Sequence, residues 1–578
     1  MSAVSKTKYE KPSLSIILKV IAPFKKRSIF VLSIIFIDNF LASFGVGMIL
    51  PVFQVIMEPD GKKQWVTKIY PEFADFPADK RAVIVTMVAL IIFLIRFIIG
   101  FIRTGIVRDC AERLRLYWSY KIGHSILFGD YQRFLKKNQG VWLNDWLTEP
   151  LCLSRFFLSY MQYISSFTMV VVLFALGVAV NWKVMAVFVV LLGVLLLVIR
   201  KYSYGAAVDH SRHKSHLNQK LSASISESLN HIKDIKILNV EVTRLDQMAA
   251  ILDRMRGIFV RAEVLGELPR LSGELISVAA LAVVSVAATI IPGITIAEIL
   301  PTMAFFFVAI YRLMTASTTA MTGRIKAWQE FHSISMVYAL ATEVHEESHR
   351  GEVVNSIDTD IEFRGVSFTY DGDRPVLKDA NFSIERGKFI ILSGRSGAGK
   401  TTVLDLLLRF ICPQEGAIVV NGRNINEYEL YSWRKLFGYV SQDAALFFGS
   451  VRHNITLDAR DFSEDEIEKA CRLSGCHDFI KNLPQGYETM VGERGYALSG
   501  GQRKRIAIAR ALIRNPRLLI LDEATTSFES TIERDIINAL RAQYPDLTIM
   551  LISHRKDEFS EAEVFINLED GRVDVRKK

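Results

Sequence analysis

Residues 394–401 have the types and the spacing needed to hold a chain of phosphates. They read GRSGAGKT and fit the pattern G-x-x-x-x-G-K-[ST], directly after an apolar run that predicts a β-strand. The glycines let backbone N–H groups point at phosphate oxygens without an intervening side chain. Lys400 adds a positive charge, and the hydroxyl of Thr401 is the group expected to hold Mg²⁺. The predicted phosphate-binding residues are Ser396, Gly397, Ala398, Gly399, Lys400, Thr401 and Thr402.

Two adjacent carboxylates further along the chain complete this chemistry. Residues 518–521 are apolar and lead directly into Asp522 and Glu523. A carboxylate at the end of a strand reaches a phosphate-bound Mg²⁺ through a water molecule, which is the role expected of Asp522. Glu523 is expected to polarise the water that attacks the terminal phosphate. These residues predict a site that binds ATP with Mg²⁺ and hydrolyses it.

A third segment, residues 498–502, lies between these motifs, reads LSGGQ and opens a predicted helix. This ordered set resembles the nucleotide-binding domain of ATP-binding cassette (ABC) transporters. The resemblance implies that adenine stacks on Tyr370, that Gln442 senses the metal and couples the domains, and that His554 contacts the γ-phosphate. The run 491–495 resembles a segment of ABC exporters, so export is expected rather than import.

The resemblance also implies that the LSGGQ segment acts on a second copy of the chain. In this family the helix N-terminus that carries it closes over the γ-phosphate held by the partner, where free N–H groups attract anions. Because the chain has one of each motif and both are intact, we expect a homodimer with two equal sites. Glu529 stands where the family commonly has aspartate, which bears on turnover rate. The residues expected to act across the dimer are Ser499, Gly500, Gly501 and Gln502.

The N-terminal part of the 578-residue chain supplies apolar segments that approach the ~20 residues needed to cross a bilayer. Six spans are predicted, at 29–56, 83–106, 157–180, 184–199, 275–291 and 299–314. Lysine and arginine residues flank the same side of these spans, so the N-terminus and the ATPase domain are expected in the cytoplasm of a multi-pass inner-membrane protein. These flanks also explain the net charge of +9, so no nucleic-acid partner is expected.

The resemblance implies the type I ABC exporter fold, in which a bundle of six transmembrane helices precedes an α/β P-loop ATPase domain. Two polar stretches between the spans are expected to continue as helices into the cytoplasm, with turns toward the ATPase domain near 130–138 and 211–220. The expected parts are a cytoplasmic N-terminal segment with an amphipathic elbow, a transmembrane domain, a linker and a nucleotide-binding domain, at 1–27, 28–325, 326–357 and 358–578.

The cargo is inferred from charged residues within the apolar spans, because such residues are costly in a bilayer and usually face a cavity or a partner. Arg96 and Arg312 have apolar residues on both sides, and Arg270 precedes the fifth span. In a dimer these arginines would surround one cavity with six positive charges and bind phosphate groups. The alternatives are an interfacial position for Arg103 and Arg270, or structural pairing of the arginines with Asp38, Glu267 or Glu274.

Short pieces of the chain refine this prediction. Residues 47–53, 268–270 and 310–314 are similar to bacterial flippases of lipid-linked oligosaccharides. The predicted function is ATP-driven export or flipping of an anionic amphipathic substrate, preferably a lipid-linked oligosaccharide or related lipid, by alternating access of a homodimer. Export of peptides, drugs or phospholipids is one alternative, and an ATP-gated channel or regulator is another.

Overall fold

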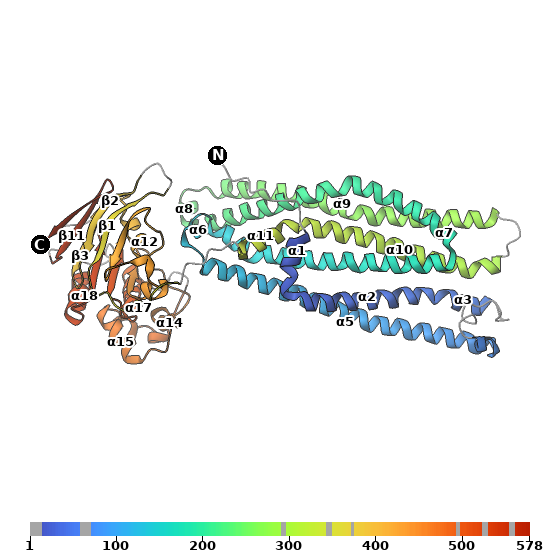
Figure 1. Ribbon diagram of the computed structural model, residues 1–578, viewed down its shortest axis with the longest axis horizontal. Coiled ribbons are helices and arrows are strands. Elements are labelled where there is room, and N and C mark those ends of the chain that lie inside the picture. Colours follow the sequence, from blue (N-terminus) through green and yellow to red (C-terminus); the bar gives the residue numbers. More distant parts are fainter. Residues whose placement is uncertain are drawn as a thin grey trace. The chain divides into compact units, whose positions relative to one another are not determined.

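The computed structural model describes residues 14–57, 71–290, 296–342, 350–370, 375–492, 498–522, 530–553 and 561–578 (Figure 1). Within these ranges, the side chains of 187–212 and most of those of 265–303 lie outside the description. The chain forms two compact units, one of Met1–Gly129 and Phe134–Val344 and the other of Asp130–Arg133 and His345–Lys578. The main boundary falls inside the segment 326–357 expected to be a linker.

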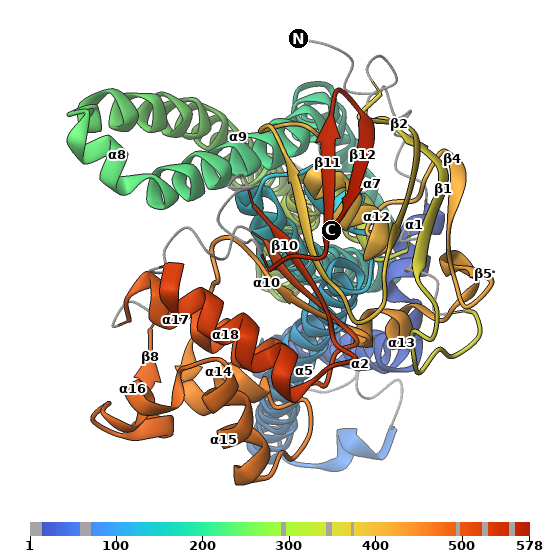
Figure 2. The same ribbon diagram turned by 90° about the vertical axis from the view of Figure 1, so that its left-hand side faces the viewer.

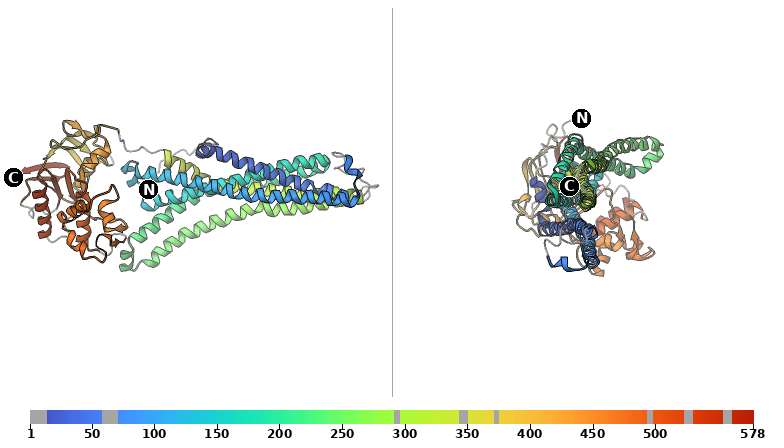
Figure 3. Two further views of the ribbon diagram at one scale, coloured as in Figure 1. Left: turned by 90° about the horizontal axis from the view of Figure 1, so that it is seen from below. Right: turned by 90° about the vertical axis from the view of Figure 1, so that its right-hand side faces the viewer.

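The first unit is helical, and its long helices run alongside one another (Figures 1 and 3). In chain order the helices are α1 (Leu14–Ile21), α2 (Lys25–Gly47), α3 (Ile49–Met57), α5 (Ala78–Leu127), α6 (Tyr131–Leu135), α7 (Gln139–Asn230), α8 (Ile232–Ile237), α9 (Glu241–Ile290), α10 (Ile296–Gln329) and α11 (Phe331–Thr342). Among the described residues, four segments are long and apolar enough to cross a membrane: Ser15–Val55, Ala78–Leu127, Gln139–Val180 and Ala304–Gln329. They coincide with the predicted first, second, third and sixth spans, while most side chains of the other two lie outside the description.

Helix α7 folds back on itself between Gly177 and Met185 (Figure 1). A Cβ atom added to Gly177 would lie 2.6 Å from the sulfur of Met185. Residues eight apart in a straight helix are separated by about 12 Å along the axis, so the chain must reverse between them. Hydrogen bonds join the two arms, from Gln219 to Asp145 at 3.3 Å and from Ser215 to Glu149 at 3.0 Å.

The two turns predicted to reach toward the ATPase domain had different outcomes. Asp130–Arg133 belongs to the second unit, where the rings of Tyr131 and Phe410 lie 4.8 Å apart, as expected for the turn at 130–138. The placement of the other turn at 211–220 was wrong, because those residues lie within the second arm of α7. This arm contains no proline to stop it and ends only at Asn230, so the turn is formed by α8 instead.

We expect Gly140→Ala to destabilise the first unit more than Gly105→Ala. A Cβ atom on Gly140 would lie 2.4 Å from the backbone oxygen of Ser222 in the opposite arm of α7, whereas one on Gly105 would have no neighbour within 4 Å among the described residues. Because a backbone clash is relieved only by separating the arms, the cost is about 1–3 kcal/mol. Thermal unfolding of both variants in nanodiscs checks this, and equal midpoints would contradict the close packing.

The second unit is an α/β domain built around a six-stranded sheet (Figure 2). The strands β12 (Arg572–Lys577), β11 (Val564–Glu569), β3 (Phe389–Gly394), β10 (Thr548–Ile552), β9 (Leu518–Asp522) and β6 (Phe437–Val440) lie in that order. All neighbours are parallel except β11 and β12. Strands β3, β9 and β10 are almost entirely buried, which explains their uninterrupted apolar sequences.

Helices cover both faces of this sheet, and alternate strand residues point to each face. Helix α12 (Lys400–Leu407) packs on one face, where Leu392, Ile520 and Met550 belong to the same core. Helices α17 (Gly500–Leu512) and α18 (Ser530–Gln543) pack on the other, with Ile391. The remaining helices are α13 (Leu430–Lys435), α14 (Val451–Thr456), α15 (Glu464–Leu473) and α16 (His477–Lys481).

A second, four-stranded antiparallel sheet packs into the same core as α12. Its strands are β2 (Leu377–Ile384), β1 (Ile361–Phe368), β4 (Glu415–Val420) and β5 (Arg423–Asn424), in that order, and β7 (Gly449–Ser450) pairs with β8 (Met490–Val491) elsewhere. The end of β1 therefore brings Tyr370 toward the start of α12, whose Thr402 hydroxyl lies 3.3 Å from the tyrosine oxygen.

Candidate active site

The carboxyl ends of β3 and β9 meet at one edge of the parallel sheet, where ligands of open α/β folds bind. A cavity of 540 Å³ lies there. It gathers side chains from the glycine-rich loop, the end of β9 and two other loops. The lining residues are Tyr370, Val376, Ser396, Gly397, Gly399, Lys400, Thr401, Thr402, Gln442 and Asp522. Thus nearly all the described residues predicted to bind nucleotide within one chain lie in one cavity.

The glycine-rich loop has the conformation that its sequence predicts. Gly397 and Gly399 have φ angles of +81° and +102°, a region in which a side chain is strained. Gly399 also precedes α12, whose free N–H groups attract phosphate. Lys400 is buried, and its Nζ donates hydrogen bonds to the carbonyl oxygens of Gly394 and Arg395 at 3.0 and 3.2 Å. The loop is therefore a cradle with a fixed cation at its centre.

Two polar residues that the sequence analysis did not single out lie beside Asp522. The hydroxyl of Tyr439 donates a hydrogen bond to Asp522 Oδ2 at 3.1 Å. Burial, together with the negative charge of Asp522, raises the pKa of Asp405 to about 6. Asp405 is the one charged residue in the apolar run 403–408, which begins in α12. A charge within an apolar run is the feature of the sequence that could have identified Asp405 as a site residue. Asp405 and Asp522 therefore interact as an acidic pair, of which Asp522 lines the cavity.

This acidic pair fits the expected Mg²⁺. Burial and the charge of Asp522 both disfavour the ionised form of Asp405, and a divalent cation placed here would neutralise this concentration of negative charge. Among the described residues, no group of three or more histidine, cysteine, aspartate or glutamate side chains forms a metal cage. A magnesium ion that accompanies ATP needs no such cage, because it takes most of its ligands from phosphates and water.

The LSGGQ segment lies outside this cavity. Ser499 caps α17: its hydroxyl accepts a hydrogen bond from Gln502 N at 3.2 Å, and the Gln502 side chain accepts one from Ser499 N at 2.9 Å. None of its four predicted site residues is among those that line the cavity. The same chain therefore does not bring Lys400 and Gly500 into one pocket.

Several predicted residues lie outside the described part of the chain. Glu523 follows Asp522 at the end of β9, and His554 follows Ser553 after β10, but neither is itself described. Glu529 and the side chain of Arg270 are likewise outside the description. Their roles remain predictions.

Two arginines of α5 form ion pairs with one carboxylate of α2. Arg103 Nη1 lies 2.5 Å from Asp38 Oδ2, and Arg96 Nε lies 3.9 Å from Asp38 Oδ1. The charges of Arg103 and Arg312 both act on Arg96, and Arg312 has no ion pair among the described residues. Arg103 therefore belongs to this cluster and not to an isolated interfacial position.

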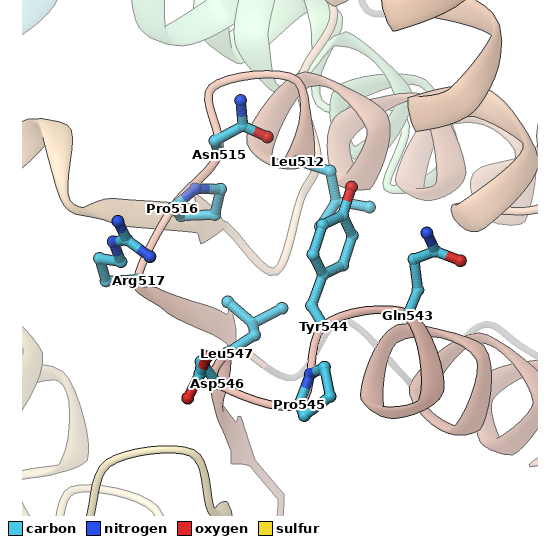
Figure 4. A pocket seen from close by; sticks show the side chains of 9 residues that line it. All are labelled: Leu512, Asn515, Pro516, Arg517, Gln543, Tyr544, Pro545, Asp546 and Leu547. Atoms are coloured by element: carbon cyan, nitrogen blue, oxygen red, sulfur yellow. The ribbon is translucent and has the colours of Figure 1, made fainter.

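A second cavity, of 400 Å³, lies at the opposite edge of the parallel sheet (Figure 4). Its lining residues come from the connections that lead into β9 and β10, and include Arg517, Tyr544 and Asp546. No residue predicted to bind nucleotide lines it. The carboxyl edge is therefore the better candidate for the ATP site.

Comparisons with known proteins agree with this geometry. Residues 377–526 match the ABC transporter family model, and residues 34–316 match the ABC transporter transmembrane region. A protein of Yersinia pestis bv. Antiqua (strain Antiqua), named ATP-dependent lipid A-core flippase, is 32% identical over 396 residues, which cover 68% of each chain. A protein of the same name from Photobacterium profundum is 38% identical over 281 residues, 48% of each chain. A solved bacterial Atm1-family ABC exporter with ATP bound has the same fold, with a TM-score of 0.74 and 21% identity over 95% of both chains.

Proposed function

The chain belongs to the ABC transporters, as an exporter-type half-transporter, and from this premise we propose that it flips an anionic lipid across the membrane. Membership in this family means that ATP hydrolysis is coupled to transport in a multi-pass membrane protein. The preferred cargo is a lipid-linked oligosaccharide or a related lipid with phosphate in its headgroup. Relatives that are named flippases of lipid A-core support a lipid cargo.

The observation that carries this proposal is the surplus of positive charge between the membrane helices. Arg96 and Arg103 both approach Asp38, which is the only carboxylate that forms an ion pair with either of them among the described residues, and the positive charge of Arg312 also acts on Arg96. Unmatched charges are costly within a bilayer, so they are retained where they face a cavity, a partner or a charged substrate. Guanidinium groups bind phosphate oxygens in pairs, which makes a phosphate-bearing headgroup a suitable counter-charge.

The ATP site drives the transport cycle in this proposal. Lys400 and the loop amides hold the phosphates, Tyr370 stacks on adenine, and Thr401 with Asp522 holds Mg²⁺, assisted by Gln442. When bound, Mg²⁺ would supply positive charge that stabilises the phosphates of ATP during hydrolysis. Glu523 orients and polarises the attacking water, and His554 contacts the γ-phosphate.

Two chains assemble in this cycle, because each LSGGQ segment completes the site of its partner. ATP binding closes the two ATPase domains, and hydrolysis reopens them, so that the membrane helices alternate between two accessible states. We place the N-terminus and the ATPase domain in the cytoplasm and the protein in the inner membrane, because basic residues flank that side of the spans.

The test measures ATP hydrolysis by the purified protein in lipid nanodiscs, with and without a polyprenyl-pyrophosphate-linked saccharide. We expect the lipid to stimulate the wild type severalfold and to have no effect on the Arg96→Ala/Arg312→Ala variant, because about two guanidinium contacts per chain are lost. The matched control is Arg113→Ala/Arg115→Ala, which removes two other arginines of the helix that carries Arg96, each paired with a nearby carboxylate.

An equal response of wild type and double variant would mean that the arginines are structural. Stimulation by peptides or hydrophobic drugs, without stimulation by the lipid, would favour the alternative exporters. Ion conductance on nucleotide binding would instead indicate a channel.

A further inference from the structure

Asp38 lies between two arginines of the neighbouring helix. Its side chain is only 5% exposed in α2, and Arg96 and Arg103, two helical turns apart in α5, approach its two oxygens. Gly100 lies between these arginines, and a Cβ atom added there would be 3.5 Å from Asp38 Oδ1. The carboxylate therefore rests against α5 at Gly100.

The two arginines are not held equally. Arg103 Nη1 donates hydrogen bonds to Asp38 Oδ2 at 2.5 Å and to Ser165 Oγ at 3.4 Å. The side-chain amide of Asn39 also donates a hydrogen bond to Ser165 Oγ. Arg96 Nε lies 3.9 Å from Asp38, which is too long for a hydrogen bond. This Nε atom is buried and has no hydrogen-bond partner in the described part of the chain. Asp38 thus satisfies Arg103 and leaves Arg96 with an unused donor.

A structural ion pair would match one carboxylate with one guanidinium. Here two guanidinium groups share one carboxylate, and the positive charge of Arg312 also acts on Arg96. A further anion bound at this place would balance the surplus positive charge and accept a hydrogen bond from the unused donor of Arg96. A phosphate group can supply several oxygens to neighbouring guanidinium groups at once.

We propose that Asp38 is an internal counter-ion that competes with the phosphate or pyrophosphate of an anionic lipid headgroup for Arg96 and Arg103. This inference rests on the proposed function and adds a residue that sets substrate specificity. A neutral lipid has no group that outcompetes the carboxylate, so it is rejected. A phosphate group, with its greater charge and more acceptor oxygens, displaces Asp38, and the returning carboxylate helps to release the lipid.

The test is the concentration of polyprenyl-pyrophosphate-linked saccharide that gives half-maximal stimulation of ATP hydrolysis in nanodiscs. Asp38→Asn keeps the shape of the side chain and removes its charge, so we expect this concentration to fall about fivefold or more. Asp38→Glu keeps the charge and brings a carboxylate closer to Arg96, so we expect the concentration to rise about twofold or more. The matched control is Asp109→Asn, which removes an exposed partner of Arg113 on the same helix and leaves the value unchanged.

The two variants test the inference in opposite directions, so a folding defect in Asp38→Asn leaves Asp38→Glu as the deciding measurement. An unchanged half-maximal concentration in a folded Asp38→Asn protein, or an unchanged or lower one in Asp38→Glu, would overturn the inference. Inorganic pyrophosphate is added in a separate arm. If it stimulates Asp38→Asn without lipid, the ligand is the free anion and the assignment to a lipid headgroup is wrong.

The failure of this inference differs from the failure of the proposed function. If the wild type does not respond to any phosphate-bearing lipid, the proposed function itself is wrong. If the wild type responds and only the Asp38 variants fail to shift the concentration, the anionic cargo stands and the counter-ion role alone is rejected.

Discussion

Glu523→Gln is expected to lower ATP hydrolysis by about 100-fold or more while ATP binding is kept. The amide has the shape of the carboxylate but does not draw a proton from the attacking water. Asp522, the preceding residue, lines the cavity together with Lys400. Phosphate release measures hydrolysis, and equilibrium binding of labelled ATP measures affinity.

Two further variants serve as controls for this result. Lys400→Ala should lose ATP binding as well as hydrolysis, because it removes the cation at the centre of the loop. Asp546→Asn changes a carboxylate at the opposite edge of the sheet and should leave both unchanged (Figure 4). Turnover near the wild-type rate in Glu523→Gln would refute the assigned role. Prolonged ion conductance in Glu523→Gln would instead indicate an ATP-gated channel.

The second large effect is expected in dimers whose two chains carry different substitutions. If each ATP site combines the loop of one chain with the LSGGQ segment of the other, then Lys400→Ala in one chain and Gly500→Asp in its partner place both defects in one site. The other site stays intact. When both substitutions are in the same chain and the partner is wild type, each site has one defect. Hydrolysis should therefore differ by about tenfold or more between the two arrangements, with the first more active.

The two dimers contain the same substitutions, so each is the control for the other. They are purified with a different affinity tag on each chain and compared for ATP hydrolysis. If each site were formed within a single chain, the order would reverse, because a wild-type chain would keep its whole site. In the structure Gly500 does not line the cavity that contains Lys400, which is why we expect the first order.

The local sequence determined the chemistry of the ATP site and the class of protein. The loop around Gly397 and Gly399 could be predicted because its conformation depends on glycines that are adjacent in the chain. The described membrane spans could be predicted because transfer of an apolar segment into lipid depends on its own length and composition. Buried parallel strands were recognisable for the same reason, since both of their faces are apolar.

The tertiary structure decided which distant residues meet. Asp405 lies far from Asp522 in the chain, and their proximity arises from the packing of α12 against the sheet. The two arms of α7 likewise approach closely at Gly140 and Ser222, which are far apart in the chain. Asp38 could be named as a candidate partner, but only the contact between α2 and α5 selected Arg103 as its closest ion pair. Such contacts depend on how whole helices and strands pack together. The free energy of this packing comes from residues that are far apart in the chain, so a short stretch of sequence does not predict it.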